Sequence, residues 1–475
     1  MQALDLICNI FVPESNAGNE LAYGVVANQN DDLLETFIEA MARPDGPKWR
    51  KATDGEIESL MENGTWELVK LPPNKRAIGS HWVFRIKRKV DGEVDRYKAQ
   101  LVAKGYSQCP GIDYDEVFAP TACWAALCTI LANGALEGAY IELVDISNAY
   151  LNGILDSSTE VYMKQPEGYH QGNSNQVCKL KRGLYGLKQG GRLWYERLGE
   201  VLQSMGFKRL QSDNSVYIWM ANGVKVIIPV FVDNLTLVSK SKEGIDRIKS
   251  QLAANFKLKD LGPTSWLLGV EVIYNREKHT LKLSQRQYII DILKRFGMAD
   301  CKPVTTPMVP GSHLSTTMRP STPLEKEEMR KVPYLNAIGA LNYLAICTRP
   351  DISYAVGCLA HYSGDPGPTH WTAVKHVMRY LKGTMDLKLM YSPSNSSYPF
   401  QAWTDADHSG NPDNGRSTSG YILKIGTGAV SWSSKLQNIV TLSTTEAEFV
   451  AATSAGTEVI WTLYGGWYSC SLNPM

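Results

Sequence analysis

Two aspartates at the ends of apolar segments are the residues of this sequence best placed to do chemistry. Asp145 ends the run YIELVD, and Asp233 follows IIPVFV at a turn between two apolar segments. Two carboxylates ~4 Å apart repel each other by about 4 kcal/mol at an effective dielectric near 20. A divalent cation would remove that repulsion, and Mg²⁺ prefers oxygen ligands and leaves positions open for phosphate. The pair indicates a metal site, although an aspartate at a strand end is more often a cap or turn residue.

The apolar segments around these aspartates predict the elements that must position them. Residues 140–153 predict a strand that ends at Asp145 and passes into a turn or helix. Residues 225–238 predict two strands joined at Asp233 and Asn234. A further hairpin, with basic residues on its open face, is predicted around the turn-forming VDGE of residues 81–106. Apolar stripes at helical spacing predict helices at 285–296 and 370–382.

Composition divides the chain into segments. Residues 1–45 lack sustained periodicity and predict a loosely ordered acidic leader. Stretches rich in Pro, Ser, Thr and Gly at 308–323 and 392–399 predict breaks between a large first unit, a mainly helical middle and a β-rich end. We therefore expect units at 46–305, 306–395 and 396–475, and no helix within 311–322.

Charge and composition limit the classes of function. Between Lys70 and Lys104 ten basic residues stand against three acidic ones, an excess that can neutralise phosphates but that fits a solvated hairpin equally well. No apolar run approaches the ~18 residues that a membrane span needs. Nine cysteines are scattered singly, which argues against a zinc ribbon or a disulfide framework. No secretory signal or Arg-rich transit peptide fits the N-terminus, so we expect a cytoplasmic or nuclear protein.

Seven successive segments resemble blocks of copia-type reverse transcriptases, in the same order and with the same spacing. The resemblance runs from about residue 47 to residue 461. The segments are WELVKLPPNKRAIGSHWVFRIKRK, DRYKAQLVAKGYSQCPGIDYDEVFAP, VDISNAYLNGILDSSTEVYMKQPEGY, KRGLYGLKQGGRLWYERL, FVDNLTLV, FKLKDLGPTSWLLGVEV and LSQRQYIIDILKRFGMADCKPVTTPM.

The resemblance implies roles for individual residues. Asp145 corresponds to the first metal-binding aspartate of the palm, and Asp233 to the first aspartate of the family's aromatic-Val-Asp-Asp turn. Tyr150 matches the aromatic residue that excludes a ribose 2′-hydroxyl, a task that suits a flat, rigid ring, although the same ring could simply fill the core. The remaining nucleotide-binding positions implied by the family are Lys98, Lys104, Gln165 and Glu167.

The departures from the family pattern predict a weakened enzyme. Asn234 stands where the family has a second aspartate, and an amide is neutral and offers one oxygen instead of two. We therefore expect a more stable but poorer metal site. Pro229 removes a backbone donor from a strand that the family fills with aliphatic residues.

Residues 402–449 resemble the ribonuclease H block of copia elements, and their pattern predicts three antiparallel strands followed by a helix. Asp405 and Glu448 match two of that fold's metal-binding acids. Glu446 instead fits a capping box with Ser443. Because two acids cannot build a two-metal site, we expect a truncated and inactive ribonuclease H-like domain with an open sheet edge.

Taken together, the resemblance implies an α+β right-hand polymerase with fingers, palm and thumb, a helical connection and a partial ribonuclease H-like sheet. The implied reaction is RNA-directed DNA polymerisation with Mg²⁺ or Mn²⁺. The implied partners are an RNA template, a DNA primer, deoxynucleoside triphosphates and the rest of a Pol polyprotein, in a cytoplasmic virus-like particle. A decayed, non-catalytic remnant that still binds nucleic acid is the alternative that Asn234 favours.

Overall fold

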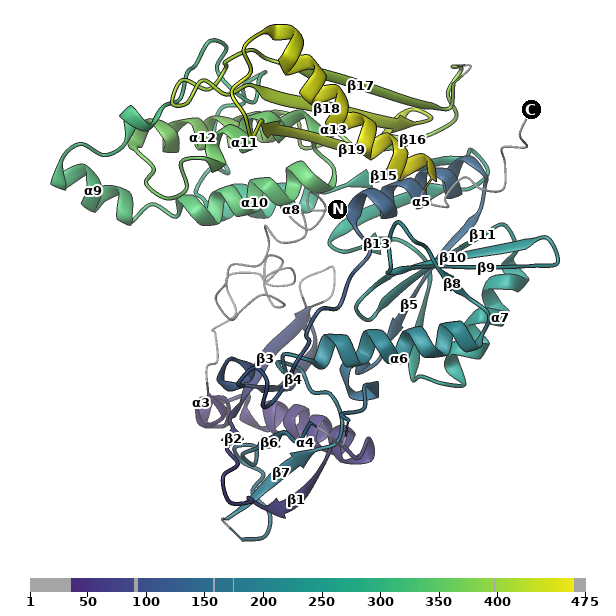
Figure 1. Ribbon diagram of the computed structural model, residues 1–475. Coiled ribbons are helices and arrows are strands. Elements are labelled where there is room, and N and C mark those ends of the chain that lie inside the picture. Colours follow the sequence, from purple (N-terminus) through teal and green to yellow (C-terminus); the bar gives the residue numbers. More distant parts are fainter. Residues whose placement is uncertain (1–35, 89–92, 157–158, 174, 397, 465–475) are drawn as a thin grey trace.

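The computed structural model describes residues 36–88, 93–156, 159–173, 175–396 and 398–464. Within them the chain is an α+β protein with an N-terminal unit, a central sheet, a group of helices and a C-terminal sheet. Figure 1 shows the N-terminal unit at one end of the molecule and the C-terminal sheet and helices at the other. The predicted α+β class is confirmed.

The central sheet has six strands in the order β12-β5-β11-β10-β9-β8. Alternate residues of β5 are buried on opposite faces of this sheet, as strand geometry requires. Leu143 packs in the core that contains α5, whereas Val144 packs in the core that contains α6 and α7. The elements are α5 (Trp124–Leu136), β5 (Tyr140–Ile146), α6 (Gly190–Ser204), β8 (Lys208–Arg209), β9 (Val216–Ala221), β10 (Val224–Phe231), β11 (Asn234–Ser239), α7 (Lys242–Ala253) and β12 (Leu258–Pro263).

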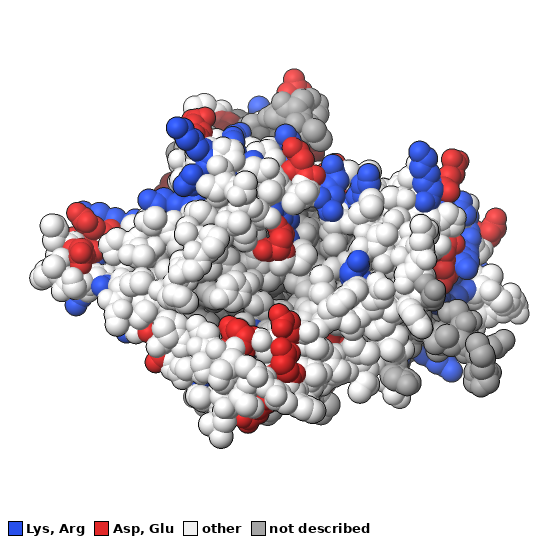
Figure 2. Space-filling model, turned by 90° about the horizontal axis from the view of Figure 1, so that it is seen from above, with Lys and Arg blue, Asp and Glu red and all other residues white. Residues whose placement is uncertain are grey.

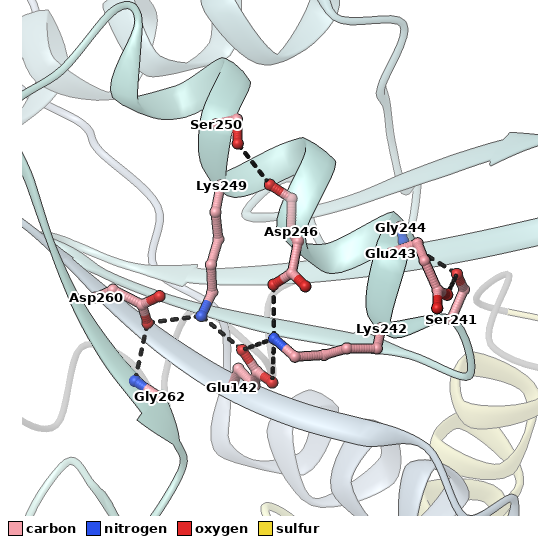
Figure 3. A network of polar contacts seen from close by, with 10 residues as sticks. All are labelled: Glu142, Ser241, Lys242, Glu243, Gly244, Asp246, Lys249, Ser250, Asp260 and Gly262. Carbon is pink, nitrogen blue, oxygen red and sulfur yellow. Dashed lines mark hydrogen bonds and ion pairs between the residues drawn. The ribbon is translucent and has the colours of Figure 1, made fainter.

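A buried ion-pair network ties β5 to α7 and β12 (Figure 3). The Lys249 ammonium lies 2.5 Å from a Glu142 carboxylate oxygen and 2.6 Å from an Asp260 oxygen. The side chains of Lys249 and Glu142 are only 9% and 6% exposed. Lys242, which is more exposed, also contacts Glu142 at 3.0 Å. The network therefore fixes β5, the strand that carries Asp145, against its neighbours.

The predicted hairpin of residues 81–106 forms as β3 (Ser80–Arg88) and β4 (Val94–Ala103), a two-stranded antiparallel sheet that we call the basic hairpin. One face of the hairpin packs on Trp49 of α4, with ring centroids 5.2 Å from Phe84 and 4.6 Å from Tyr97. The rest of the N-terminal unit comprises α3 (Phe37–Ala42), α4 (Gly46–Glu62), β1 (Trp66–Lys70), β2 (Ala77–Ile78), β6 (Tyr162–Met163) and β7 (Gln176–Leu180), with short 3₁₀ turns η1 (Gly105–Ser107) and η2 (Ala149–Asn152) following the hairpin and β5.

The last part of the segment predicted as a loosely ordered acidic leader, residues 1–45, contains the short helix α3. Helix α3 begins there with a capping box in which Thr36 accepts from the backbone of Glu39 and the Glu39 carboxylate accepts from Thr36. Phe37 is buried against Trp82 and Tyr169. This anchoring contact offsets the cost of ordering the segment. Residues 1–35 lie outside the described part of the chain.

The helical unit and a four-stranded sheet of order β13-β14-β15-β16 follow the central sheet. Both predicted helices form, as α8 and α12, and the segment 311–322 contains only a short 3₁₀ turn. Helix α8 packs in one core with α10 and α12. The elements are β13 (Trp266–Leu267), β14 (Val270–Asn275), β15 (Thr280–Ser284), α8 (Arg286–Arg295), η3 (Thr316–Met318), α9 (Pro323–Arg330), α10 (Tyr334–Cys347), η4 (Pro350–Ile352), α11 (Ser353–Ala360), α12 (Pro368–Gly383) and β16 (Leu389–Tyr391).

The C-terminal unit consists of three antiparallel strands and a helix, as predicted: β17 (Phe400–Ala406), β18 (Thr418–Ile425), β19 (Gly428–Leu436) and α13 (Thr444–Tyr464). Helix α5 packs on both β19 and the central sheet, so that Leu127 and Val430 belong to the same core as Ile141. In the described part of the chain, every helix is too short or too polar to cross a membrane.

His370 at the start of α12 joins this helix to the segment that contains η3. Its Nδ1 atom accepts from the Gly367 amide at 2.9 Å, so Nε2 must carry the proton that it donates to the Ser315 carbonyl at 3.2 Å. Burial lowers the pKa of His370, although the Ser315 carbonyl and nearby carboxylates partly oppose that shift. Protonation would therefore break the bond from Gly367.

We expect His370 to make the protein sensitive to acid. Because its folded-state pKa is lowered, its contribution to stability is complete above the unfolded value of about 6.5 and is lost as pH falls through the folded-state pKa. The unfolding free energy, measured by urea denaturation from pH 8 to pH 5, should fall less steeply in His370→Gln than in the wild type. His313→Gln, a change at an exposed histidine, should keep the wild-type slope.

Candidate active site

The pairing of β5 with β11 brings the two predicted aspartates together. Asp145 lies directly opposite Asn234 in the strand register, and the Ile146 amide donates to the Asp233 carbonyl at 2.8 Å. Antiparallel partners have Cα atoms about 4.5 to 5.5 Å apart, so the two carboxylates lie at the same end of the strands of the central sheet. We call this end the sheet edge. The predicted juxtaposition of residues 145 and 233 is therefore present.

The turn that carries Asp233 is strained. Val232 has a φ of 57°, a left-handed conformation that is unfavourable for a β-branched residue. Its carbonyl accepts a 2.7 Å hydrogen bond from the indole of Trp194, a buried residue of α6. This contact helps to hold the turn in the conformation that places Asp233 beside Asp145.

Electrostatics at the sheet edge favour a cation. Burial raises the pKa of Asp233, and the Asp145 carboxylate raises it further. The Asn234 amide nitrogen donates to an Asp233 oxygen at 2.9 Å, which stabilises the charged form and occupies one oxygen that a metal could use. Two carboxylates next to an amide thus fit a divalent ion, with one carboxylate fewer than the family pattern.

Tyr150 lies near enough to Asp233 for the charge of that carboxylate to act on its hydroxyl. It is in η2, directly after the left-handed Asn148, and its ring meets that of Tyr185 edge-on at 4.6 Å. Burial, and then the charge of Asp233, raise the pKa of Tyr150 to about 12. The residue is therefore a neutral aromatic wall next to the carboxylates.

Four cations share the open face of the basic hairpin, because Arg85 pairs with Lys98 and Lys87 pairs with Arg96 across its two strands. Lys98 is close enough to Asp233 to lower the pKa of that carboxyl, against the stronger effect of burial. Desolvation and then the other three cations lower the pKa of Lys87, while Asp145 acts in the opposite direction. The charges of this face therefore act on the two carboxylates at the sheet edge. Lys87 was missed from the sequence, although the two-residue alternation from Arg85 signals it.

Three predicted nucleotide-binding residues contact other parts of the N-terminal unit. The Lys104 side chain lies along Gly79, where an added Cβ would be 3.2 Å from the Lys104 Cδ. The buried Gln165 amide donates to the carbonyls of Gln171 and Gln176 at 3.0 Å. The Glu167 carbonyl accepts from a tryptophan indole at 3.0 Å. The contacts of Lys104 and Gln165 give these two side chains structural roles away from the Asp145–Asp233 pair, whereas the contact of Glu167 involves its backbone alone.

Residues 63–310 match the family model described as reverse transcriptase (RNA-dependent DNA polymerase). The chain belongs to the reverse transcriptase family. The match spans the basic hairpin, both aspartates and the central sheet. The predicted resemblance is thereby confirmed.

Relatives of this reverse transcriptase chain place it among copia-type Pol polyproteins. It is 42% identical over 434 residues to the Retrovirus-related Pol polyprotein from transposon TNT 1-94 of Nicotiana tabacum, covering 91% of this chain and 32% of that protein. It is 38% identical over 418 residues to that from transposon RE1 of Arabidopsis thaliana, covering 87% and 28%. The chain thus spans about a third or less of these relatives.

A foamy viral protease-reverse transcriptase, solved in complex with double-stranded DNA, is a looser structural match. The TM-score is 0.46 at 12% sequence identity, and the match covers 94% of this chain and 64% of that one.

Pro229 affects the pairing of its strand without ending it. Strand β10 runs through Pro229, which pairs with Val216 of β9. On the other side, the register of β10 with β11 passes from Ile227 to Val230 with no pairs at the two positions between. The missing amide of proline accounts for this gap, next to the turn that carries Asp233.

The acids of the C-terminal unit are not gathered into a metal site. Asp405 on β17 and Glu448 in α13 both have exposed side chains. The Glu446 carboxylate accepts from the Leu442 amide at 2.7 Å, so it bonds the backbone at the helix start as predicted. Across residues 36–464, apart from the short undescribed gaps, no three His, Cys, Asp or Glu side chains form a group that could hold a metal.

Proposed function

We propose that Asp145 and Asp233 carry template-directed addition of deoxynucleotides to a DNA primer on an RNA template. The observation that supports this most directly is the register of β5 and β11, which puts both carboxylates at one sheet edge. In an intact element we propose that this reaction takes place in a cytoplasmic particle with the rest of the Pol polyprotein.

The carboxylates would hold Mg²⁺, or Mn²⁺ in its place. The effect of Asp145 on the pKa of Asp233 supports this, because a bound cation removes the repulsion between the two carboxylates. A bound ion would lower the pKa of the primer 3′-hydroxyl and neutralise charge on the leaving pyrophosphate.

The side chains around the carboxylates would orient the nucleotide. Lys98 and Lys87 on the basic hairpin would pair with the triphosphate, because Lys98 acts on the pKa of Asp233 and Asp145 acts on the pKa of Lys87. Tyr150 would pack against the sugar and select against a 2′-hydroxyl. Gln165 and Lys104 would act indirectly. Gln165 holds the loop that contains Gln171, and the Lys104 side chain packs against Gly79.

Primer extension tests the polymerase proposal. The purified chain, with poly(rA)–oligo(dT), dTTP and Mg²⁺ or Mn²⁺, should extend the primer slowly, and Asp145→Asn should lower the rate by at least about 100-fold. Equal extension by the wild type and Asp145→Asn would count against the proposal.

Asn234 favours a second candidate, a remnant that binds nucleic acid without catalysis. The amide leaves only two carboxylates at the sheet edge, while the basic hairpin keeps its four cations. If the chain is such a remnant, it should not extend the primer, but its affinity for RNA should fall steeply as the salt concentration rises. Replacement of both Lys87 and Lys98 by Gln should reduce the salt dependence by about two released counterions.

We propose that the C-terminal unit does not cleave RNA in an RNA–DNA hybrid. Asp405 and Glu448 are exposed, and Figure 2 shows the side of the molecule nearest this unit with wide uncharged areas and scattered basic and acidic side chains. Hydrolysis of a labelled hybrid should therefore proceed no faster with the wild type than with Asp405→Asn. A wild-type rate several-fold above that variant would refute the proposal.

A further inference from the structure

The outer edge of β4 is held by two different groups. Strand β4 pairs with β3 along one side, and no other strand of the described residues pairs with it. On its other side the Leu101 amide donates to a carboxylate oxygen of Glu56 at 3.3 Å, and the Ala103 amide donates to the carbonyl of Tyr185 at 2.8 Å. A two-stranded hairpin is marginally stable by itself, so these edge contacts matter for its placement.

Glu56 comes from α4, which lies before the residues that match the reverse transcriptase family model. The same helix is joined to the segment that follows Asp145, because the Asn148 amide donates to the Ser59 hydroxyl at 2.8 Å. Helix α4 therefore contacts both the basic hairpin and the turn after β5.

The second edge contact leads directly to the candidate active site. Tyr185, whose carbonyl holds Ala103, places its ring against Tyr150 at 4.6 Å. Lys98 is three residues before Leu101 on the same strand and on the open face of the hairpin. The position of Lys98 relative to Tyr150 thus depends on how the edge of β4 is held.

We propose that Glu56 is a positioning residue for nucleotide binding. It acts by anchoring Leu101, and so holds Lys98 in place relative to Asp145 and Asp233. This inference rests on the proposed polymerase function. The anchor needs an oxygen acceptor and not a charge: burial raises the pKa of Glu56, while the Leu101 amide and Lys98 oppose that shift, so the ionised form is costly at this position.

Binding of dTTP tests the proposal without requiring turnover. The full chain is loaded with poly(rA)–oligo(dT) whose primer ends in a dideoxynucleotide, and dTTP is titrated in the presence of Mg²⁺. We expect Glu56→Ala to weaken dTTP binding about 5- to 10-fold while affinity for the primer–template stays within about twofold. Glu56→Gln, which keeps the acceptor, should restore wild-type dTTP affinity. Glu58→Ala, on the exposed face of α4, is the matched control.

Wild-type dTTP affinity in Glu56→Ala, or failure of Glu56→Gln to restore it, would overturn the inference. Hydrogen exchange adds a measurement that does not depend on Glu56→Ala folding: the Leu101 amide should be protected in the wild type and Glu56→Gln, and rapid exchange there would also overturn it. If no variant binds primer–template, the proposed function fails, whereas exchange at Leu101 still decides whether the anchor exists.

Discussion

Replacement of Asn234 by Asp should raise the rate of primer extension by about tenfold or more, equivalent to roughly 1.4 kcal/mol of transition-state stabilisation. The side chain lies directly opposite Asp145 and donates to Asp233. A carboxylate there would accept where the amide donates, free the Asp233 oxygen and add a negative charge for the metal. Single-nucleotide incorporation at saturating dTTP would measure the gain.

The same change should cost stability when no metal is bound. It removes the hydrogen bond to Asp233 and places a third negative charge at the sheet edge, so we expect a loss of about 1 to 3 kcal/mol, recovered on adding Mg²⁺. Asn395→Asp, at an exposed loop position far along the chain, should alter neither rate nor stability. An Asn234→Asp protein that is no faster than the wild type would show that Asn234 is not what limits this site.

Loss of the Lys249 ammonium should destabilise the protein by about 3 kcal/mol, because it leaves the buried Glu142 carboxylate without its nearest partner. Lys249→Met keeps the length and apolar character of the side chain, so that the missing charge is the main change. Urea unfolding at pH 7 measures the loss. Lys242→Met, at a more exposed partner of Glu142, should stay within about 1 kcal/mol of the wild type.

A double variant separates the lost charge from general damage to packing. Glu142→Leu combined with Lys249→Met removes both buried charges, and should be more stable than Lys249→Met alone. If the double variant were less stable than both Lys249→Met and Glu142→Leu, the network would stabilise the fold by more than the mutual neutralisation of its buried charges.

The sequence predicted the elements whose apolar patterns are unambiguous. The runs before Asp145 and Asp233 form strands, as predicted, and the short hairpin between β10 and β11 follows from the turn at Asp233. The pairing of β11 with β5, which brings the two aspartates together, is seen only in the fold. The capping box at Thr36 was missed because residues 1–45 lack sustained apolar periodicity, although a Ser/Thr-x-x-Glu pattern was present.

Side-chain contacts between distant segments were not predictable in the same way. Gln165 is a polar residue in a loop near a basic unit, and nothing in its spacing reveals that its amide is used by the loop itself. The burial of Lys249 is easier to predict, because this residue follows Ile248 and precedes Leu252 on the apolar side of α7. A lysine at such a position requires a buried acid, but only the fold shows that the acid is Glu142.

Helix α5 has consequences for any attempt to divide the chain. Its residues contact the central sheet on one side and β19 on the other, and Tyr391 donates to the Ala429 carbonyl across the same junction. A protease that cuts the Ser- and Pro-rich segment at 392–399 would therefore leave a nicked molecule whose two pieces stay associated and melt together. Separate expression of the first 390 residues would expose the apolar surface of α5 that packs on β19, and we expect that protein to aggregate.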